Sequence, residues 1–130
     1  MILVDSSVWI DYFRGASTAQ TDKLDSLLAT ERLAVGDLIV AEVLRGFRDD
    51  AAFERARKVL DAFIVIELCG YRIAQEAAKN YRLLRARGIS VRKTVDTIIA
   101  TRCIEDRISL LHCDKDFDPF VAHLGLRSVI

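Results

Sequence analysis

The sequence predicts a three-layer α/β/α domain, in which helices cover both faces of a mainly parallel sheet of about five short strands. Short apolar runs alternate with longer segments of helical periodicity, as in βαβ units. These runs are apolar throughout, which is typical of strands buried on both faces. The 130 residues include one proline and no Gly/Ser-rich linker, so we expect a single domain over residues 1–130.

Each expected element follows from its local pattern. Runs rich in aliphatic and β-branched residues predict strands at Ile2–Val4, Leu33–Val35, Phe63–Ile66, Ser109–Leu111 and Arg127–Ile130. Apolar residues at three- and four-residue spacing predict helices at Ser7–Arg14, Ala19–Ala29, Leu38–Arg45, Ala51–Asp61, Tyr71–Arg87 and Arg92–Asp106. We expect the hydroxyls of Ser6 and Ser7 to cap the first helix and Asp37 to cap the third.

Composition narrows the functional classes. The 19 Lys and Arg residues balance 19 Asp and Glu residues, so a polyanionic partner would need a local basic patch. Three cysteines without a CxxC pair are typical of a reducing compartment. No apolar stretch approaches the ~20 residues of a membrane span, and the apolar N-terminal run is too short for a signal peptide. We therefore expect a cytoplasmic protein with no membrane partner.

Acidic residues follow two of the expected strands. Asp5 comes directly after the first strand, and Asp114 and Asp116 come shortly after the strand SLL. Parallel sheets bind ligands at the carboxyl ends of their strands, where the strand order switches. If these two strands are neighbours, the three carboxylates lie at one edge of the sheet.

Two further acids lie on apolar faces of expected helices. Asp96 shares a face with Ile99, Ala100 and Cys103, and Glu42 shares one with Leu38 and Ile39. An ionised carboxylate on an apolar face is costly unless it is paired or binds a metal. Acids that converge from separate elements repel one another unless a cation compensates. Oxygen ligands without a set of histidines and cysteines favour Mg²⁺ or Mn²⁺ over zinc.

Each acid, taken alone, also has an ordinary structural explanation. Asp5 could favour the positive end of the helix dipole. Glu42 could pair with Arg45, and Asp96 with Arg92 or Lys93. The last acids could belong to a solvated turn that precedes a helix; they are Asp114, Asp116 and Asp118.

A basic segment leads into the helix that carries Asp96. Its members are candidates for contacts with RNA phosphates: Arg82, Arg85, Arg87, Arg92 and Lys93. An ordinary solvated helix face explains them equally well. Metal-free RNA cleavage commonly uses two histidines, but the only ones are His112 and His123, and we expect His112 in the core or at its rim.

Four segments carry a resemblance to a known family. In chain order they are ILVDSSVWIDYFRG, AEVLRG with Glu42, TVDTIIA with Asp96, and LLHCDKDFDPF with Asp114 and Asp116. Together they resemble the PIN domain, and within it the VapC-type toxins of toxin–antitoxin pairs. His112-Cys113 stands where a Thr often precedes the last acids. The resemblance covers nearly the whole chain and implies a single PIN-like domain.

The resemblance implies a Mg²⁺-dependent endoribonuclease, with Mn²⁺ as a possible substitute, that cleaves RNA by metal-activated water. It implies that Asp5, Glu42, Asp96 and Asp114 form the catalytic metal-binding set and that Asp116 assists. Ser6 occupies the place of the usual hydroxyl residue and could orient a metal-bound water. The sequence leaves open whether one ion or two are bound. It also leaves open whether Asp114 or Asp116 is the direct ligand.

The resemblance also implies partners. Family members usually form homodimers and are neutralised by a small VapB-like antitoxin, often through a basic side chain that enters the acidic pocket. A non-catalytic PIN module that binds RNA or protein is the alternative. A haloacid-dehalogenase-type phosphatase is disfavoured because DSSV lacks the DxD pair.

Overall fold

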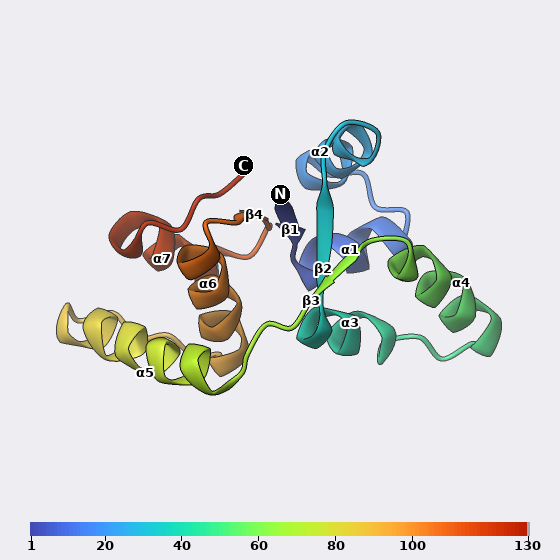
Figure 1. The fold of residues 1–130 in the computed structure, drawn as a ribbon. Coiled ribbons are helices and arrows are strands. Elements are labelled where there is room, and N and C mark those ends of the chain that lie inside the picture. The colour runs from blue at the N-terminus through green and yellow to red at the C-terminus, as the bar shows by residue number, and fades with distance from the viewer. Residues whose placement is uncertain (130) are drawn as a thin grey trace.

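Residues 1–129 are described by a computed structural model. Figure 1 shows a central sheet between two groups of helices. The strands are β1 (Ile2–Val4), β2 (Leu33–Gly36), β3 (Ile64–Ile66) and β4 (Ser109–Leu111). The helices are α1 (Ser6–Phe13), α2 (Ala19–Leu28), α3 (Asp37–Leu44), α4 (Asp50–Asp61), α5 (Tyr71–Ala86), α6 (Thr94–Asp106), the 3₁₀-helix η1 (Lys115–Phe117) and α7 (Asp118–Leu124).

The sheet has the order β3-β2-β1-β4, and all three strand pairs are parallel. The chain moves from β1 outward to β3, then returns past β1 to form β4. The strand order therefore switches between β1 and β4, which are neighbours. This is the position at which parallel sheets bind ligands, and both strands end there in a segment that carries acids.

Two layers of helices enclose the sheet. Helices α1 to α4 pack on one another at one face, and α5 packs on α6 and α7 at the other (Figure 1). Between them lies a core of aliphatic and aromatic side chains, in which Trp9, Phe117 and Phe120 are completely buried. The predicted three-layer fold is confirmed.

The number of strands differs from the expectation. The predicted fifth strand, Arg127–Ile130, is reduced to an isolated parallel bridge between Ser128 and Leu110, and Ile130 lies outside the described residues. Within residues 1–129 the sheet therefore has four strands. The sequence signal was weak there because Arg127 and Ser128 interrupt the apolar run.

The expected cap of α3 was wrong. Gly36 occupies the N-cap position, and Asp37 is the first helical residue. Oδ1 of Asp37 accepts hydrogen bonds from the backbone N–H of Leu38, at 2.8 Å, and from that of Leu68, at 3.0 Å. Asp37 thus fixes the segment between β3 and α5, a long-range contact that local spacing cannot reveal.

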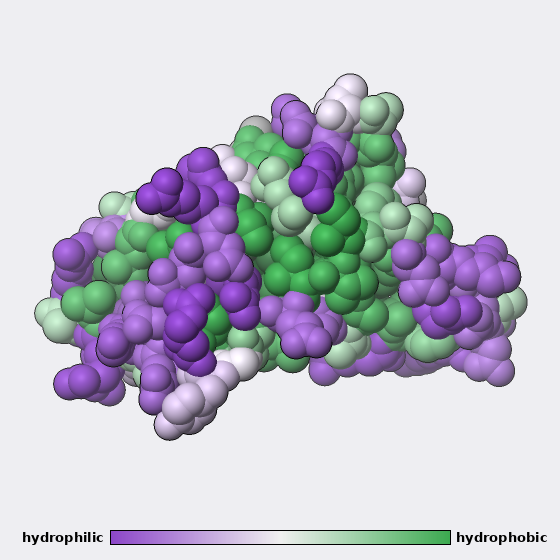
Figure 2. All heavy atoms as spheres, in the orientation of Figure 1, coloured by the Kyte–Doolittle hydropathy of each residue, from purple (hydrophilic) through white to green (hydrophobic). Residues whose placement is uncertain are grey.

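Strand β3 forms an edge of the sheet and is the least covered strand, with Val65 62% exposed. Hydrophobic residues gather across the middle of the face in Figure 2, between hydrophilic regions over α4 and over α5 and α6. Within the described part of the chain, no helix is long and apolar enough to cross a membrane.

Candidate metal centre

Asp5 caps the first helix with one carboxylate oxygen and leaves the other free within the described part of the chain. It is the N-cap of α1, and its Oδ2 accepts hydrogen bonds from Ser7, at 3.2 Å from the backbone N and 2.6 Å from Oγ. Its other oxygen, Oδ1, is buried and has no hydrogen-bond partner among residues 1–129. Asp5 is only 3% exposed. Burial raises the pKa of this carboxyl, and the hydrogen bonds from Ser7 oppose the rise.

The junction of β1 and β4 places Asp5 beside the second acidic segment. Its backbone N–H donates to the carbonyl of Leu111 at 2.9 Å, so the carboxyl ends of the two strands are joined. Ser6 and Ser7 were expected to cap α1 through their hydroxyls. Instead Asp5 is the cap, and the hydroxyl of Ser7 orients its carboxylate.

Asp96 lies in the first turn of α6 and is 6% exposed. Its Oδ2 is buried without a hydrogen-bond partner in the described residues. Burial, followed by repulsion from Asp5, raises the pKa of Asp96 to about 7; Asp114 and Glu42 add to this effect and Lys93 opposes it. Carboxylates from several elements therefore share one electrostatic environment at Asp96.

Asp114 and Asp116 follow β4 at the start of η1. Oδ1 of Asp114 accepts a hydrogen bond from the backbone N–H of Asp116 at 2.9 Å. His112, which is buried, supports this turn: Nδ1 lies 3.1 Å from the carbonyl of Asp114, and Nε2 lies 3.1 Å from Oγ of Ser128. His112 thus lies in the core rim, as expected. Oxygens of Asp96, Asp114 and Asp116 all lie within 4.8 Å of one another.

Glu42 projects from α3, which follows β2. It is half-buried, and its Oε1 has no hydrogen-bond partner in the described residues. Glu42 lies outside the tight group of Asp96, Asp114 and Asp116, but it is close enough to raise the pKa of Asp96. The ion pair with Arg45 that could have explained Glu42 is absent from the described part of the structure.

Lys93 is the cation closest to these acids, and its role was missed from the sequence. Its Nζ lies 3.3 Å from Oδ2 of Asp114 and 3.5 Å from Oδ2 of Asp116. The hydrogen bond to Asp114 raises the pKa of the lysine ammonium. A direct pair between Lys93 and Asp96 was expected as an alternative, but Lys93 pairs with the other two acids. Its position immediately before α6 was the available signal, since it projects from the helix end.

The donor set fits a hard divalent cation. Three buried carboxylate oxygens have no protein donor in the described residues, on Asp5, Glu42 and Asp96. A carboxyl with a pKa of about 7 is stabilised in its ionised form by a nearby cation. Among residues 1–129, the acids Asp96, Asp114 and Asp116 are the only group of three or more His, Cys, Asp or Glu side chains close enough to share an ion. Oxygen donors of this kind suit Mg²⁺ and Mn²⁺.

The predicted basic residues separate into different places. Arg82 and Arg85 line a groove between α5 and α6, and Arg92 is exposed in the segment before α6. Nη1 of Arg87 lies 3.1 Å from Nδ1 of His123 on α7. The five residues thus have different neighbours in the structure, and of these five Lys93 is the one that contacts the acids.

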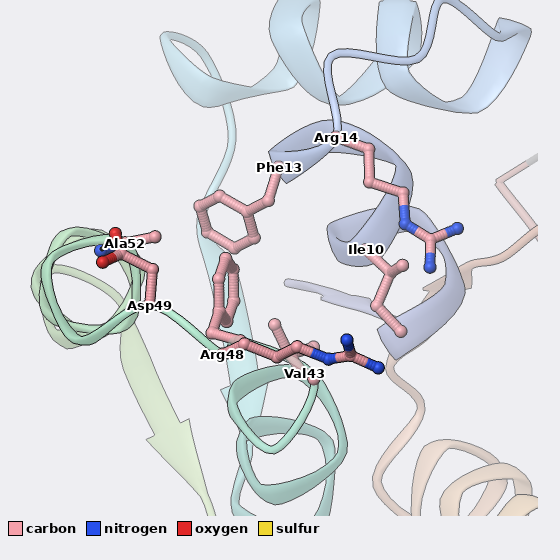
Figure 3. Close-up of a pocket in the computed structure, with 9 residues that line it drawn as sticks. Ile10, Phe13, Arg14, Val43, Arg48, Asp49 and Ala52 are labelled. Atoms are coloured by element: carbon pink, nitrogen blue, oxygen red, sulfur yellow. Dashed lines mark hydrogen bonds between the residues drawn. The ribbon is translucent and has the colours of Figure 1, made fainter.

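A pocket of about 400 Å³ lies between α1, α3 and α4 (Figure 3). Phe13 and Phe47 contact edge to face within it, with ring centroids 5.8 Å apart. The side chains of Arg14 and Arg48 lie at its rim on either side of Ile10. The pocket contains none of the acids predicted for the site.

Comparison with known proteins identifies the family to which this arrangement of acids belongs. The PIN domain family model matches residues 2–120, which include every acid described above. The chain belongs to the PIN domain family. This PIN domain is 34% identical over 123 residues to Ribonuclease VapC11 of Mycobacterium tuberculosis, covering 91% of this chain and 90% of that protein.

Solved structures agree on the fold. The PIN domain superposes on a chain of VapBC2 from Rickettsia felis, crystallised with a promoter DNA fragment, with a TM-score of 0.75 at 15% identity, covering 98% of this chain and 97% of that one. For VapC20 of Mycobacterium tuberculosis, described as a toxin that cleaves the Sarcin-Ricin loop, the TM-score is 0.68 at 16% identity, with 95% of each chain covered. At these identities the likeness concerns the fold.

Proposed function

We propose that this PIN domain is a Mg²⁺-dependent endoribonuclease and the toxin of a VapBC-type toxin–antitoxin system. The proposal is supported chiefly by buried carboxylate oxygens that have no hydrogen-bond partner among residues 1–129 and that gather near the switch between β1 and β4. The 34% identity to a protein named as a ribonuclease supports RNA as the substrate. The single domain over residues 1–130 remains part of this proposal.

Asp5, Glu42, Asp96 and Asp114 are the proposed catalytic metal ligands, with Asp116 as an auxiliary ligand. When bound, Mg²⁺ or Mn²⁺ lowers the pKa of a coordinated water and neutralises charge on the scissile phosphate. Asp5 and Asp96 contribute by holding carboxylate oxygens in a buried site, where water does not compete for them.

Neighbouring side chains have supporting roles in this proposal. Ser7 orients the carboxylate of Asp5 through a hydrogen bond of 2.6 Å. Ser6, half-buried at the start of α1, remains a candidate for orienting a metal-bound water. The proposed contacts to RNA phosphates are Arg82, Arg85, Arg87, Arg92 and Lys93.

The proposed partners follow from the relatives. VapBC complexes are among the structural neighbours, so we propose a VapB-like antitoxin as the protein partner of this chain and a homodimer as its assembly. Balanced charge, unpaired cysteines and the absence of a membrane-spanning helix in the described residues are compatible with the proposed cytoplasmic location.

The deciding experiment measures cleavage of labelled single-stranded RNA in Mg²⁺ or Mn²⁺. We expect cleavage that EDTA abolishes and that Asp5→Asn reduces by about 10²-fold or more. Asparagine also caps helices well, so this variant keeps α1 intact. Asp118→Asn is the matched control, because Asp118 is exposed in the same segment as Asp114 and lies outside the acidic group.

Two outcomes would contradict the proposal. Cleavage that persists in EDTA and in Asp5→Asn would exclude a metal-dependent reaction at these acids. RNA binding without cleavage in either metal would favour the alternative, a non-catalytic PIN module that acts by binding.

A further inference from the structure

A groove of about 450 Å³ lies on the surface where α5 packs on α6, in the helical layer opposite α1 to α4. Its apolar lining includes alanines of α5 together with Ile98 of α6. Its rim carries Tyr81, Arg82 and Arg85. The residues that line it include two arginines and no acid, so the groove suits a ligand that is both flat and anionic.

Helix α6 lies between the groove and the acidic site. Thr94 and Thr97 line it, and Asp96 lies between them in the sequence with its side chain buried among the other acids. Lys93, which contacts Asp114 and Asp116, immediately precedes Thr94. At about 100° per residue, Thr94, Thr97 and Ile98 share one face of α6, whereas Asp96 lies on the other side of the helix, so the groove and the acids occupy opposite sides of its first turn.

Tyr81 and Arg85 form a preorganised pair on the rim. The guanidinium carbon of Arg85 lies 5.5 Å from the centroid of the Tyr81 ring, within the range of a cation–π contact. Tyr81 is 38% exposed, so part of its ring is open to a ligand. Aromatic rings that stack bases, next to arginines that contact phosphates, are the usual combination in sites for single-stranded nucleic acid.

We propose that the groove between α5 and α6 binds a nucleotide of single-stranded RNA, with the base against Tyr81 and the phosphates at Arg82 and Arg85. The proposal rests on the proposed ribonuclease function for its substrate class. It assigns two of the five basic residues to one subsite and leaves Arg87, which contacts His123 of α7, outside it.

Binding is measured separately from cleavage. The probe is a fluorescein-labelled single-stranded RNA of mixed sequence, and its anisotropy is followed in EDTA with the full chain. We expect Tyr81→Ala to weaken binding at least about fivefold, as removal of a stacking platform for one base does. We expect the double variant Arg82→Ala, Arg85→Ala to reduce the slope of log K against log salt by about 0.7 for each phosphate that the variant no longer neutralises.

Matched controls lie on the same elements. Tyr71→Ala removes an 82% exposed tyrosine of α5 that does not line the groove. Arg55→Ala removes an exposed arginine of α4, on the other helical layer. Both should bind RNA as the parent does. Arg82→Lys with Arg85→Lys keeps the charge and should restore most of the salt dependence, which excludes misfolding as the cause of any weaker binding.

The outcomes separate this proposal from the proposed function. Unchanged RNA affinity in the groove variants would overturn it, and a change of oligomeric state with unchanged RNA affinity would assign the groove to a contact between copies. If the parent cleaves no RNA but the groove variants lose RNA binding, the subsite stands and the ribonuclease function fails. If the parent cleaves RNA and the variants bind and cleave normally, the function stands and the subsite fails.

Discussion

Nζ of Lys93 lies 3.3 Å from Oδ2 of Asp114, so the acidic site already contains a protein cation. The same ammonium lies 3.5 Å from Asp116. A divalent ion that binds these acids must share them with Lys93 or displace it. The lysine is 59% exposed, so its side chain is free to move toward solvent.

Replacing Lys93 with Met should therefore tighten metal binding, because the variant removes both a competitor and a repelling charge. We expect the Kd for Mn²⁺, measured by calorimetry, to fall severalfold. Lys115→Met is the matched control: Lys115 is exposed on η1 and forms no ion pair among the described residues. Weaker Mn²⁺ binding in Lys93→Met would contradict competition between the lysine and the metal.

Stability of the metal-free protein should depend on Asp96. Its pKa is about 7 in the folded protein against an ordinary value of 3.8, so the folded state binds this proton more tightly than the unfolded chain does. The free energy of unfolding should therefore fall as pH rises from about 4 to about 7, by at most about 4 kcal/mol. Asp96→Asn should remove most of this decline.

The measurement is thermal unfolding in EDTA across this pH range. Asp96→Asn should unfold at a higher temperature than the parent at about pH 8 and at nearly the same temperature at about pH 4. A parent whose stability rises between these values relative to Asp96→Asn would mean that Asp96 is ionised at low cost, and would argue against a site that needs a cation.

Metal binding should stabilise the folded state. At a free Mn²⁺ or Mg²⁺ concentration about a hundredfold above Kd, we expect the free energy of unfolding to increase by about 2.7 kcal/mol. EDTA should reverse the increase. Asp96→Asn should lack it, because Asp96 is the acid that the carboxylates of Asp5, Asp114 and Glu42 all repel. An equal increase in Asp96→Asn would place the ion elsewhere.

The two serines of DSSV should have different effects. Ser7→Ala removes the 2.6 Å hydrogen bond to Asp5, and we expect it to weaken Mn²⁺ binding and to lower the free energy of unfolding by about 1 kcal/mol. Ser6→Ala keeps that bond and serves as the comparison. If Ser6→Ala lowers the cleavage rate at unchanged Mn²⁺ affinity, Ser6 acts on the reacting water as the sequence suggested.

Gly36→Ala should destabilise the protein for a steric reason. A Cβ at Gly36 would overlap Cδ1 of Leu68, which is completely buried. The backbone of Leu68 is held at its N–H by Asp37 and at its carbonyl by Nε of Arg102, so it cannot retreat easily. We expect the free energy of unfolding in urea to fall by about 1–3 kcal/mol.

Gly46→Ala is the control for this steric effect. A Cβ at Gly46 would meet only the carbonyl of Val43, at 3.6 Å, which is an ordinary contact. Its free energy of unfolding should stay within about 0.5 kcal/mol of the parent. Equal stability of the two variants would show that the segment around Leu68 moves to accommodate the added methyl group.

The local elements were predictable because their signals are short-range. Short apolar runs located β1 and β4 with their observed bounds, and helical periodicity located α1 to α6 within one or two residues at each end, whereas α7 was not predicted. The prediction of a fifth strand was wrong at Arg127 and Ser128. Polar residues break the apolar pattern there, and a single β-bridge is found in place of a strand. Asp37 was mistaken for a cap because its partner, Leu68, is 31 residues away in the sequence.

The sequence by itself determined the alternation of strands and helices and named the acids, since apolar patterning and residue type are written in the chain. Only the tertiary structure decided that β1 and β4 are neighbours, that Lys93 contacts Asp114 rather than Asp96, and that Arg82 and Arg85 border a groove that Arg87 does not. The physical reason is that burial, and the repulsion that raises the pKa of Asp96, depend on distances between side chains from separate elements. Those distances exist only after the sheet and its two helical layers have packed.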